Sequence, residues 1–154
     1  MIGMKIISKI YETEEVSIVS FEKTPAQIGF ISELFRRIAD AGINVDMISQ
    51  TAPKGEKNNL SFTIAGEWVM EVTALAARMN SGIKPLISTG NVKISLYGEA
   101  MPEQAGVAAG VFDLLNAAGI DILLITTSDV DISLVVSSAN ADRALAILKK
   151  AYLD

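Results

Sequence analysis

The sequence of 154 residues contains no histidine and no cysteine. Without histidine, the chain lacks both the commonest general base and the commonest metal ligand of proteins. Without cysteine, it can form no disulfide and offers no thiolate as nucleophile or metal ligand. We therefore expect no catalytic residues, no metal site and no cofactor, although Asp, Glu, Lys and Ser could in principle still support an independent enzyme.

Long apolar runs and an excess of positive charge are also missing. No stretch approaches the roughly 20 apolar residues that a membrane-spanning helix needs, and the N-terminal segment lacks the apolar centre of a signal peptide. Lys and Arg together number 13 against 18 Asp and Glu, which gives a formal charge of −5. Such a charge provides no electrostatic attraction for nucleic acid. The sequence predicts a cytoplasmic protein that binds neither membranes nor nucleic acid.

The chain does contain an internal repeat. Residues 25–49 match residues 102–126 without a gap, at a constant offset of 77 positions (102 − 25 = 77). A period near half the chain length indicates that one supersecondary unit is used twice. The matched pairs are Pro25 and Pro102, Gly29 and Gly106, Phe35 and Phe112, Ala41 and Ala118, Gly42 and Gly119, Ile43 and Ile120, and Ile48 and Ile125.

The hydrophobic pattern predicts a first unit over residues 16–88. It consists of a strand over 16–21, a loop over 22–26, and a helix from Gln27 that ends at Gly42. A strand over 43–50 and a return strand around 60–64 follow, and then a second helix and a strand over 83–88. We expect one helix face to be apolar, with Ile28, Ile31, Leu34, Phe35 and Ile38.

A second unit over residues 89–154 follows the same order but lacks a last strand. We expect strands over 92–97, 120–127 and 130–136, a helix over 104–118, and a final helix capped by Ser138. A strand within residues 4–11, ended by the acidic run Glu12–Glu15, has no place in the first unit. We hypothesise that it is the missing edge strand of the second. The predicted fold class is α+β, with two ferredoxin-like βαββαβ units that have antiparallel sheets and helices on one face.

Polar groups near the helix starts and strand ends are candidate binding residues. Gly29 and Gly106 lie where free N–H groups at a helix start favour a carboxylate, although glycine there could also serve close packing. Asn44, Asp46 and Gln50 share one strand face, which could equally be a solvated face. The turn that contains Ser128 offers hydroxyl groups, but is also ordinary hairpin chemistry.

Three stretches carry a resemblance to a known family. Residues 41–50, AGINVDMISQ, resemble the signature stretch of the first ACT domain of aspartokinases. Met101 with residues 105–109 is similar to the loop and helix start of their second ACT domain, and residues 126–133 to the strand and turn that follow. The likeness covers nearly the whole chain, and the stretches occur in the right order.

The resemblance implies a regulatory region that binds a small amino acid, lysine or threonine, in aspartate-family (lysine) biosynthesis. It implies a homodimer, with effectors held between the first unit of one chain and the second unit of another, and a partner catalytic subunit or domain of aspartate kinase. The effector-binding positions transferred by motif are Gly29, Asn44, Asp46 and Gln50 in the first unit and Asp121, Ile122 and Ser128 in the second.

The chain departs from the family pattern at three places. Residues 26–29 lack the acidic residue and the proline of the first loop, and Ala105 stands where the family tends to have proline. Asp121 replaces the preferred asparagine, which would favour a cationic effector, lysine over threonine. No counterpart of the kinase domain is present, so a separate subunit, a fragment and a free-standing ACT protein remain open. The alternative function is a structural dimerisation module with a degenerate effector site.

Overall fold

The computed structural model describes residues 5–79 and 82–154. The chain divides into two compact units, described separately below. The first unit is Glu15–Gly90, and the second is Asn91–Asp154 together with the stretch that ends at Glu14. Two long strands, β1 (Lys9–Pro25) and β4 (Leu86–Tyr97), contribute to both units. Each has a left-handed residue where it leaves one unit, Glu15 with φ 56° and Gly90 with φ 71°.

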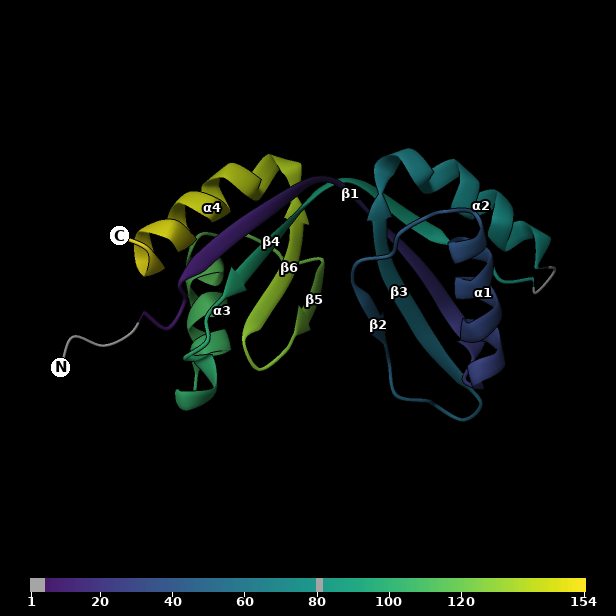
Figure 1. Cartoon of the computed structure of the whole chain (residues 1–154), viewed down its shortest axis with the longest axis horizontal. Coiled ribbons are helices and arrows are strands. Elements are labelled where there is room, and N and C mark those ends of the chain that lie inside the picture. Colours follow the sequence, from purple (N-terminus) through teal and green to yellow (C-terminus); the bar gives the residue numbers. More distant parts are fainter. Residues whose placement is uncertain (1–4, 80–81) are drawn as a thin grey trace. The chain divides into compact units, whose positions relative to one another are not determined.

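The first unit has the strand order β2-β3-β1-β4. After β1 come α1 (Ile28–Asp40), β2 (Ile48–Gln50) and β3 (Lys57–Ala65), followed by the short helix η1 (Gly66–Trp68) and α2 (Val69–Arg78). Both β1 and β2 pair with β3 in antiparallel fashion, and α1 and α2 lie on one face of these strands (Figure 1). Gly42, with φ 77°, follows α1 in the left-handed conformation of a helix terminator.

The second unit has the order β1-β4-β6-β5, which is the same arrangement with β1 in the place of the last strand. Its elements are β4, η2 (Met101–Glu103), α3 (Val107–Ala117), β5 (Leu124–Thr127), β6 (Asp131–Ser137) and α4 (Ser138–Tyr152). The helices α3 and α4 cover one face of the strands (Figure 1). The amide of Ser8 donates to the carbonyl of Tyr97 at 2.8 Å, which ties the N-terminal stretch to β4. The predicted fold class is confirmed.

Each unit has its own core between helices and strands. In the first unit Val19, Phe21, Leu60, Phe62 and Ile64 project from the strands onto Leu34, Ile38, Val72 and Leu75 of the helices. In the second, Ile7, Val92, Ile94, Leu96, Ile132, Leu134 and Val136 meet Val111, Leu115, Ala144 and Leu148. The alternation of apolar and polar residues in the strands therefore points one strand face at the helices, as period-two patterning requires.

Matching serine pairs join neighbouring strands in the two units. The hydroxyls of Ser20 and Ser61 lie 2.9 Å apart between β1 and β3. Those of Ser95 and Ser133 lie 3.2 Å apart between β4 and β6. Such cross-strand pairs stabilise a sheet through the side chains. The repeat thus extends to a polar contact that the sequence interpretation did not include.

Several predicted strand ends are wrong. The acidic run Glu12–Glu15 does not end the first strand, because its side chains are exposed and β1 continues through it. The predicted loop over 22–26 belongs largely to β1, where Thr24 pairs with Asn58 and Pro25 with Lys57. The predicted strands over 83–88 and 92–97 are one strand, β4. Glycine makes this possible, since Gly90 adopts a left-handed conformation within it. Residue 4 of the predicted N-terminal strand lies outside the described residues.

The second strand of each unit is shorter than predicted. Only 48–50 and 124–127 form regular ladders, instead of 43–50 and 120–127. Residues 43–47 nevertheless keep the expected alternation, with Ile43 and Met47 buried and Asp46 exposed. The amide of Asp46 donates to the carbonyl of Thr63 at 3.1 Å, so the segment stays attached to β3 outside the regular ladder.

Helix starts also differ from the predictions. Ile28 is 76% exposed because it stands at the first position of α1, ahead of the part that packs on the sheet. The helix predicted over 104–118 begins only at Val107, since η2 precedes it and Gly106 occupies the N-cap position. Ser138 is the first residue of α4 and not its cap, and Ser137 at the N-cap makes no side-chain capping hydrogen bond.

Candidate functional site

Gly29 lies in the first turn of α1, and its surroundings do not explain why it is glycine. A Cβ atom added there would meet nothing within 4 Å. Its φ is not in the left-handed range, so the backbone does not demand glycine either. Close packing against any described part of this chain, the alternative explanation for Gly29, is therefore excluded. What remains is an open helix start with N–H groups that can receive an anion.

Gly106 differs from its counterpart in the repeat. It stands at the N-cap of α3 with φ 84°, a conformation that other residues rarely adopt. A Cβ atom there would also meet nothing within 4 Å. The glycine is thus required by the backbone of the η2–α3 turn, and it gives no independent indication of a ligand.

The first-unit candidates Asn44, Asp46 and Gln50 are all exposed but do not converge on one point. Gln50 pairs with Leu60 of β3, whereas Asp46 bonds the carbonyl of Thr63, three residues further along that strand. Three extended residues span about 10 Å. Gln50 lies at the end of β2 that leads into the β2–β3 hairpin, and the amide of Ala26 reaches the carbonyl of Glu56 in that hairpin at 2.9 Å. The loop before Gly29 and the end of β2 therefore meet the same hairpin.

The second-unit candidates have different local roles. Asp121 is exposed, while the side chain of Ile122 packs against the core, so its backbone is the part left to contact a ligand. Ser128 stands in the β5–β6 turn, where its amide donates to the carbonyl of Asp131 at 2.8 Å and its hydroxyl accepts from the amide of Val130 at 3.4 Å. Ser128 thus serves the hairpin, as the alternative explanation proposed.

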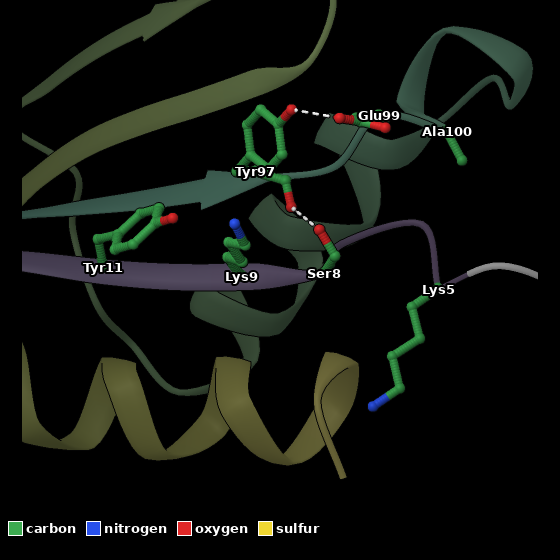
Figure 2. Close-up of a pocket in the computed structure, with 7 residues that line it drawn as sticks. All are labelled: Lys5, Ser8, Lys9, Tyr11, Tyr97, Glu99 and Ala100. Carbon is green, nitrogen blue, oxygen red and sulfur yellow. Dashed lines mark hydrogen bonds between the residues drawn. The ribbon is translucent and has the colours of Figure 1, made fainter.

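A hollow of about 550 Å³ in the second unit was not found from the sequence. Figure 2 shows its lining, contributed by the start of the chain and the end of β4: Lys5, Ser8, Lys9, Tyr11, Tyr97, Glu99 and Ala100. The ammonium of Lys9 lies 5.9 Å from the ring centre of Tyr97, a cation–π distance. The Tyr97 hydroxyl donates to Glu99 at 3.0 Å, and this hydrogen bond raises the pKa of the phenol, with desolvation and the Glu99 charge adding to it. Sequence reasoning missed the hollow because 89 positions separate Ser8 from Tyr97.

A smaller hollow of about 280 Å³ lies at the start of α3 in the same unit. Its lining includes Gln104, Gly106, Val107 and Gly110, together with the N-terminal stretch and Tyr152 of α4. It is the place where a ligand could approach the N–H groups of this helix. None of Asp121, Ile122 and Ser128 lines either hollow.

The first unit has a hollow of about 540 Å³ beside the β2–β3 hairpin, lined by Lys23, Thr51, Ala52, Lys54, Lys57, Asn58 and Asn59. Thr51, which follows Gln50 in the sequence, lines this hollow, but none of the predicted effector residues does. Within residues 5–79 and 82–154, no group of three or more Asp and Glu side chains could hold a metal ion. In that same part of the chain, no helix is long and apolar enough to cross a membrane.

Comparison with known proteins relates most of the chain to aspartokinases. Residues 86–152 match the ACT domain model. An aspartokinase of Bacillus sp. (strain MGA3) is 31% identical over 144 residues, which cover 90% of this chain and 34% of that protein. One of Mycobacterium tuberculosis is 32% identical over 143 residues, covering 90% and 33%. The chain thus spans about a third of the length of the curated relatives it matches.

Solved structures give the same result. The aspartate kinase of Synechocystis superposes with a TM-score of 0.89 at 27% identity, over 96% of this chain and 27% of that one. The regulatory subunit of aspartate kinase from Thermus thermophilus, in its ligand-free form, superposes with a TM-score of 0.85 at 24% identity, over 96% and 99%. The chain therefore resembles the tandem ACT-domain regulatory region of aspartokinases.

Proposed function

We propose that this chain is the amino-acid-sensing regulatory module of an aspartate kinase, with lysine or threonine as effector. The observation that carries the proposal is the match at about 31% identity over 90% of the chain, which includes both units and not one isolated ACT domain. An effector that binds one arrangement of the units more tightly than another would shift the population toward it. The kinase partner would respond to that shift.

The effector residues we propose are those transferred by motif: Gly29, Asn44, Asp46 and Gln50 of the first unit and Asp121, Ile122 and Ser128 of the second. Gly29 has the best support, since neither packing nor backbone conformation in this chain requires glycine there. Because the first-unit residues are spread along the second strand, we assign the carboxylate to the helix start and the rest of the ligand to the strand. We further propose a homodimer, in which a second copy completes each site.

A thermal-shift screen of the twenty amino acids tests the proposal. A ligand present at 100 times its Kd stabilises a folded protein by about 2.7 kcal/mol, which raises the Tm of a chain this size by roughly 5–11 °C. We expect such a shift with lysine, threonine or both, and a particle of twice the chain mass by light scattering. A flat screen would reject the proposal.

The acidic side chain at Asp121 makes lysine the expected effector. Isothermal titration should show tighter binding of lysine than of threonine, and Asp121→Asn should remove most of that preference. Tighter binding of threonine to the unsubstituted chain would contradict this assignment.

The second candidate function is a structural dimerisation module whose effector site has degenerated. Its support is the absence of an acidic residue and a proline at residues 26–29. This candidate predicts a dimer with no response to any amino acid. The thermal-shift screen and the isothermal titration therefore distinguish it from the first candidate.

A further inference from the structure

We propose that the hollow beside the β2–β3 hairpin of the first unit binds a small phosphate-bearing anion. Three lysines line it, Lys23, Lys54 and Lys57, and its other lining residues are Thr51, Ala52, Asn58 and Asn59. No carboxylate is among them, although the chain as a whole carries a charge of −5. A volume of about 540 Å³ lies in the range of small-molecule sites.

The position of Lys23 is fixed by an irregularity of β1. The register between β1 and β3 shifts between Phe21 and Thr24, and Lys23 has a φ of 55°. Left-handed conformations are uncommon and costly for residues other than glycine. The amide of Lys23 donates to the side-chain oxygen of Asn59 at 3.0 Å, which holds this conformation. Bulges of this kind redirect side chains and occur often at functional sites.

Asn58 supplies an observation that does not depend on the lysines. It is 5% exposed, and its Oδ1 accepts a hydrogen bond from the Thr24 hydroxyl at 2.7 Å. Its Nδ2 has no hydrogen-bond partner among the residues that the structure describes. A buried donor without an acceptor destabilises the folded state, so a polar group left in this state needs an explanation. Because this Nδ2 atom is inaccessible in the free chain, a ligand oxygen would pair with it only after the Asn58 side chain turns toward the hollow that the residue lines.

The hairpin itself is well ordered around the hollow. The amide of Asn59 donates to the Thr51 hydroxyl at 2.9 Å, and the amide of Thr51 donates to the carbonyl of Asn59 at 2.9 Å. The amide of Lys54 donates to the carbonyl of Lys57 at 2.7 Å, which closes the turn between these two lysines. The backbone that carries the lysines is thus held in place before any ligand binds.

Charge favours phosphate over a single carboxylate. A phosphate monoester carries about −1.5 to −2 at pH 7, and lysine is a common point-charge partner of phosphate. A monocarboxylate would leave two of the three ammonium groups uncompensated. Glu22 and Glu56 are sequence neighbours of the lysines but do not line the hollow. The proposed ligand is therefore different from the amino acid effector, and the two sites can be tested separately.

Titration of the ¹⁵N-labelled chain with pyrophosphate, at constant ionic strength, tests the proposal. We expect saturable shifts of the side-chain amide signals of Asn58 and Asn59, and at least a tenfold loss of affinity in Lys54→Gln/Lys57→Gln. The matched control is Lys149→Gln/Lys150→Gln, which removes the same charge from the last turn of α4 in the other unit. It should bind pyrophosphate like the unsubstituted chain.

Three results would overturn the proposal: shifts that grow linearly without saturation, equal losses in both double variants, or tighter binding of an acidic hexapeptide than of pyrophosphate. Orthophosphate and nucleoside triphosphates then distinguish a free phosphate from a phosphorylated metabolite as the ligand. The affinities for the free amino acids lysine and threonine should be unchanged in Lys54→Gln/Lys57→Gln. If pyrophosphate does not bind, the proposed regulatory function is therefore unaffected. If no amino acid binds, the proposed phosphate site is likewise unaffected.

Discussion

Aromatic rings are part of the buried core of the first unit, whereas the buried core residues that the structure describes in the second unit are aliphatic side chains and Met101. Phe62 has its ring centre 6.2 Å from that of Phe21 and 5.2 Å from that of Phe35. The second unit builds the corresponding layer from residues such as Ile94, Leu96 and Leu134, each of them fully buried. The same order of elements therefore results from different core residues. What the units share is the spacing of buried positions, which tolerates exchange of one apolar side chain for another.

The two units differ more sharply where their first helices begin. Gly29 has ordinary backbone geometry and open space around it, while Gly106 has φ 84°. The hairpins differ as well, since the first is longer and contributes two lysines, Lys54 and Lys57, to a hollow that Lys23 of β1 also lines. The cores keep the pattern of the repeat and the loops depart from it. This is the distribution expected when loops carry function on a common scaffold.

Removing residues 1–11 should give the largest loss of stability, and the second unit should be the one that loses it. Ile7 alone is 1% exposed, and truncating a core isoleucine costs about 2–5 kcal/mol. Hydrogen exchange should show loss of protection in β6 before β3. Equal loss in both strands would contradict our proposal that the N-terminal strand completes the second unit.

Gly98→Ala tests the same packing without a deletion. A Cβ atom at Gly98 would clash with the carbonyl oxygen of Ile6, so the N-terminal stretch would have to move. We expect a loss of about 1–3 kcal/mol or more, again confined to the second unit.

Core truncations should separate the two units. Phe62→Ala should cost about 3–5 kcal/mol and Leu134→Ala about 2–5 kcal/mol. Trp68, the single tryptophan of the chain, packs against the first core, and all three tyrosines belong to the second unit. The unfolding curve recorded by Trp68 fluorescence should therefore shift in Phe62→Ala. The curve recorded by tyrosine absorbance should shift in Leu134→Ala. If both probes moved together in both variants, the units would unfold as one cooperative body.

The two repeat glycines should respond to alanine in opposite ways. Gly106→Ala should destabilise the chain by about 1–2 kcal/mol, because alanine is strained in a left-handed conformation. Gly29→Ala should leave stability unchanged or raise it by up to about 1 kcal/mol, yet weaken amino acid binding by placing a methyl group at the open helix start. Chemical denaturation and isothermal titration measure the two effects. Unchanged effector affinity in Gly29→Ala would remove that residue from the site.

The smallest expected effect is a loss of stability at alkaline pH. Burial raises the pKa of the Tyr152 phenol, and the hydrogen bond to Glu99 is the main cause of the raised pKa of Tyr97. A raised pKa in the folded state means that stability is complete below the ordinary pKa near 10 and is lost as pH rises through the folded value. Tyr152→Phe should flatten the fall of stability between pH 9 and 11.5, measured by urea unfolding. A slope identical to that of the unsubstituted chain would contradict the burial argument.

The sequence by itself determined the two βαββαβ units, because buried positions repeat with the periods of helix and strand and glycines such as Gly42 mark helix ends. It also determined the resemblance to aspartokinases, since contiguous stretches such as residues 41–50 carry it. Strand continuity was decided by tertiary structure: the run Glu12–Glu15 looks like a strand end in the sequence, yet β1 continues through it in the folded chain. The hollows, too, are products of folding: residues as far apart as Ser8 and Tyr97 line the same one. Local patterns encode which side chains are buried, but only the folded chain brings distant polar groups together.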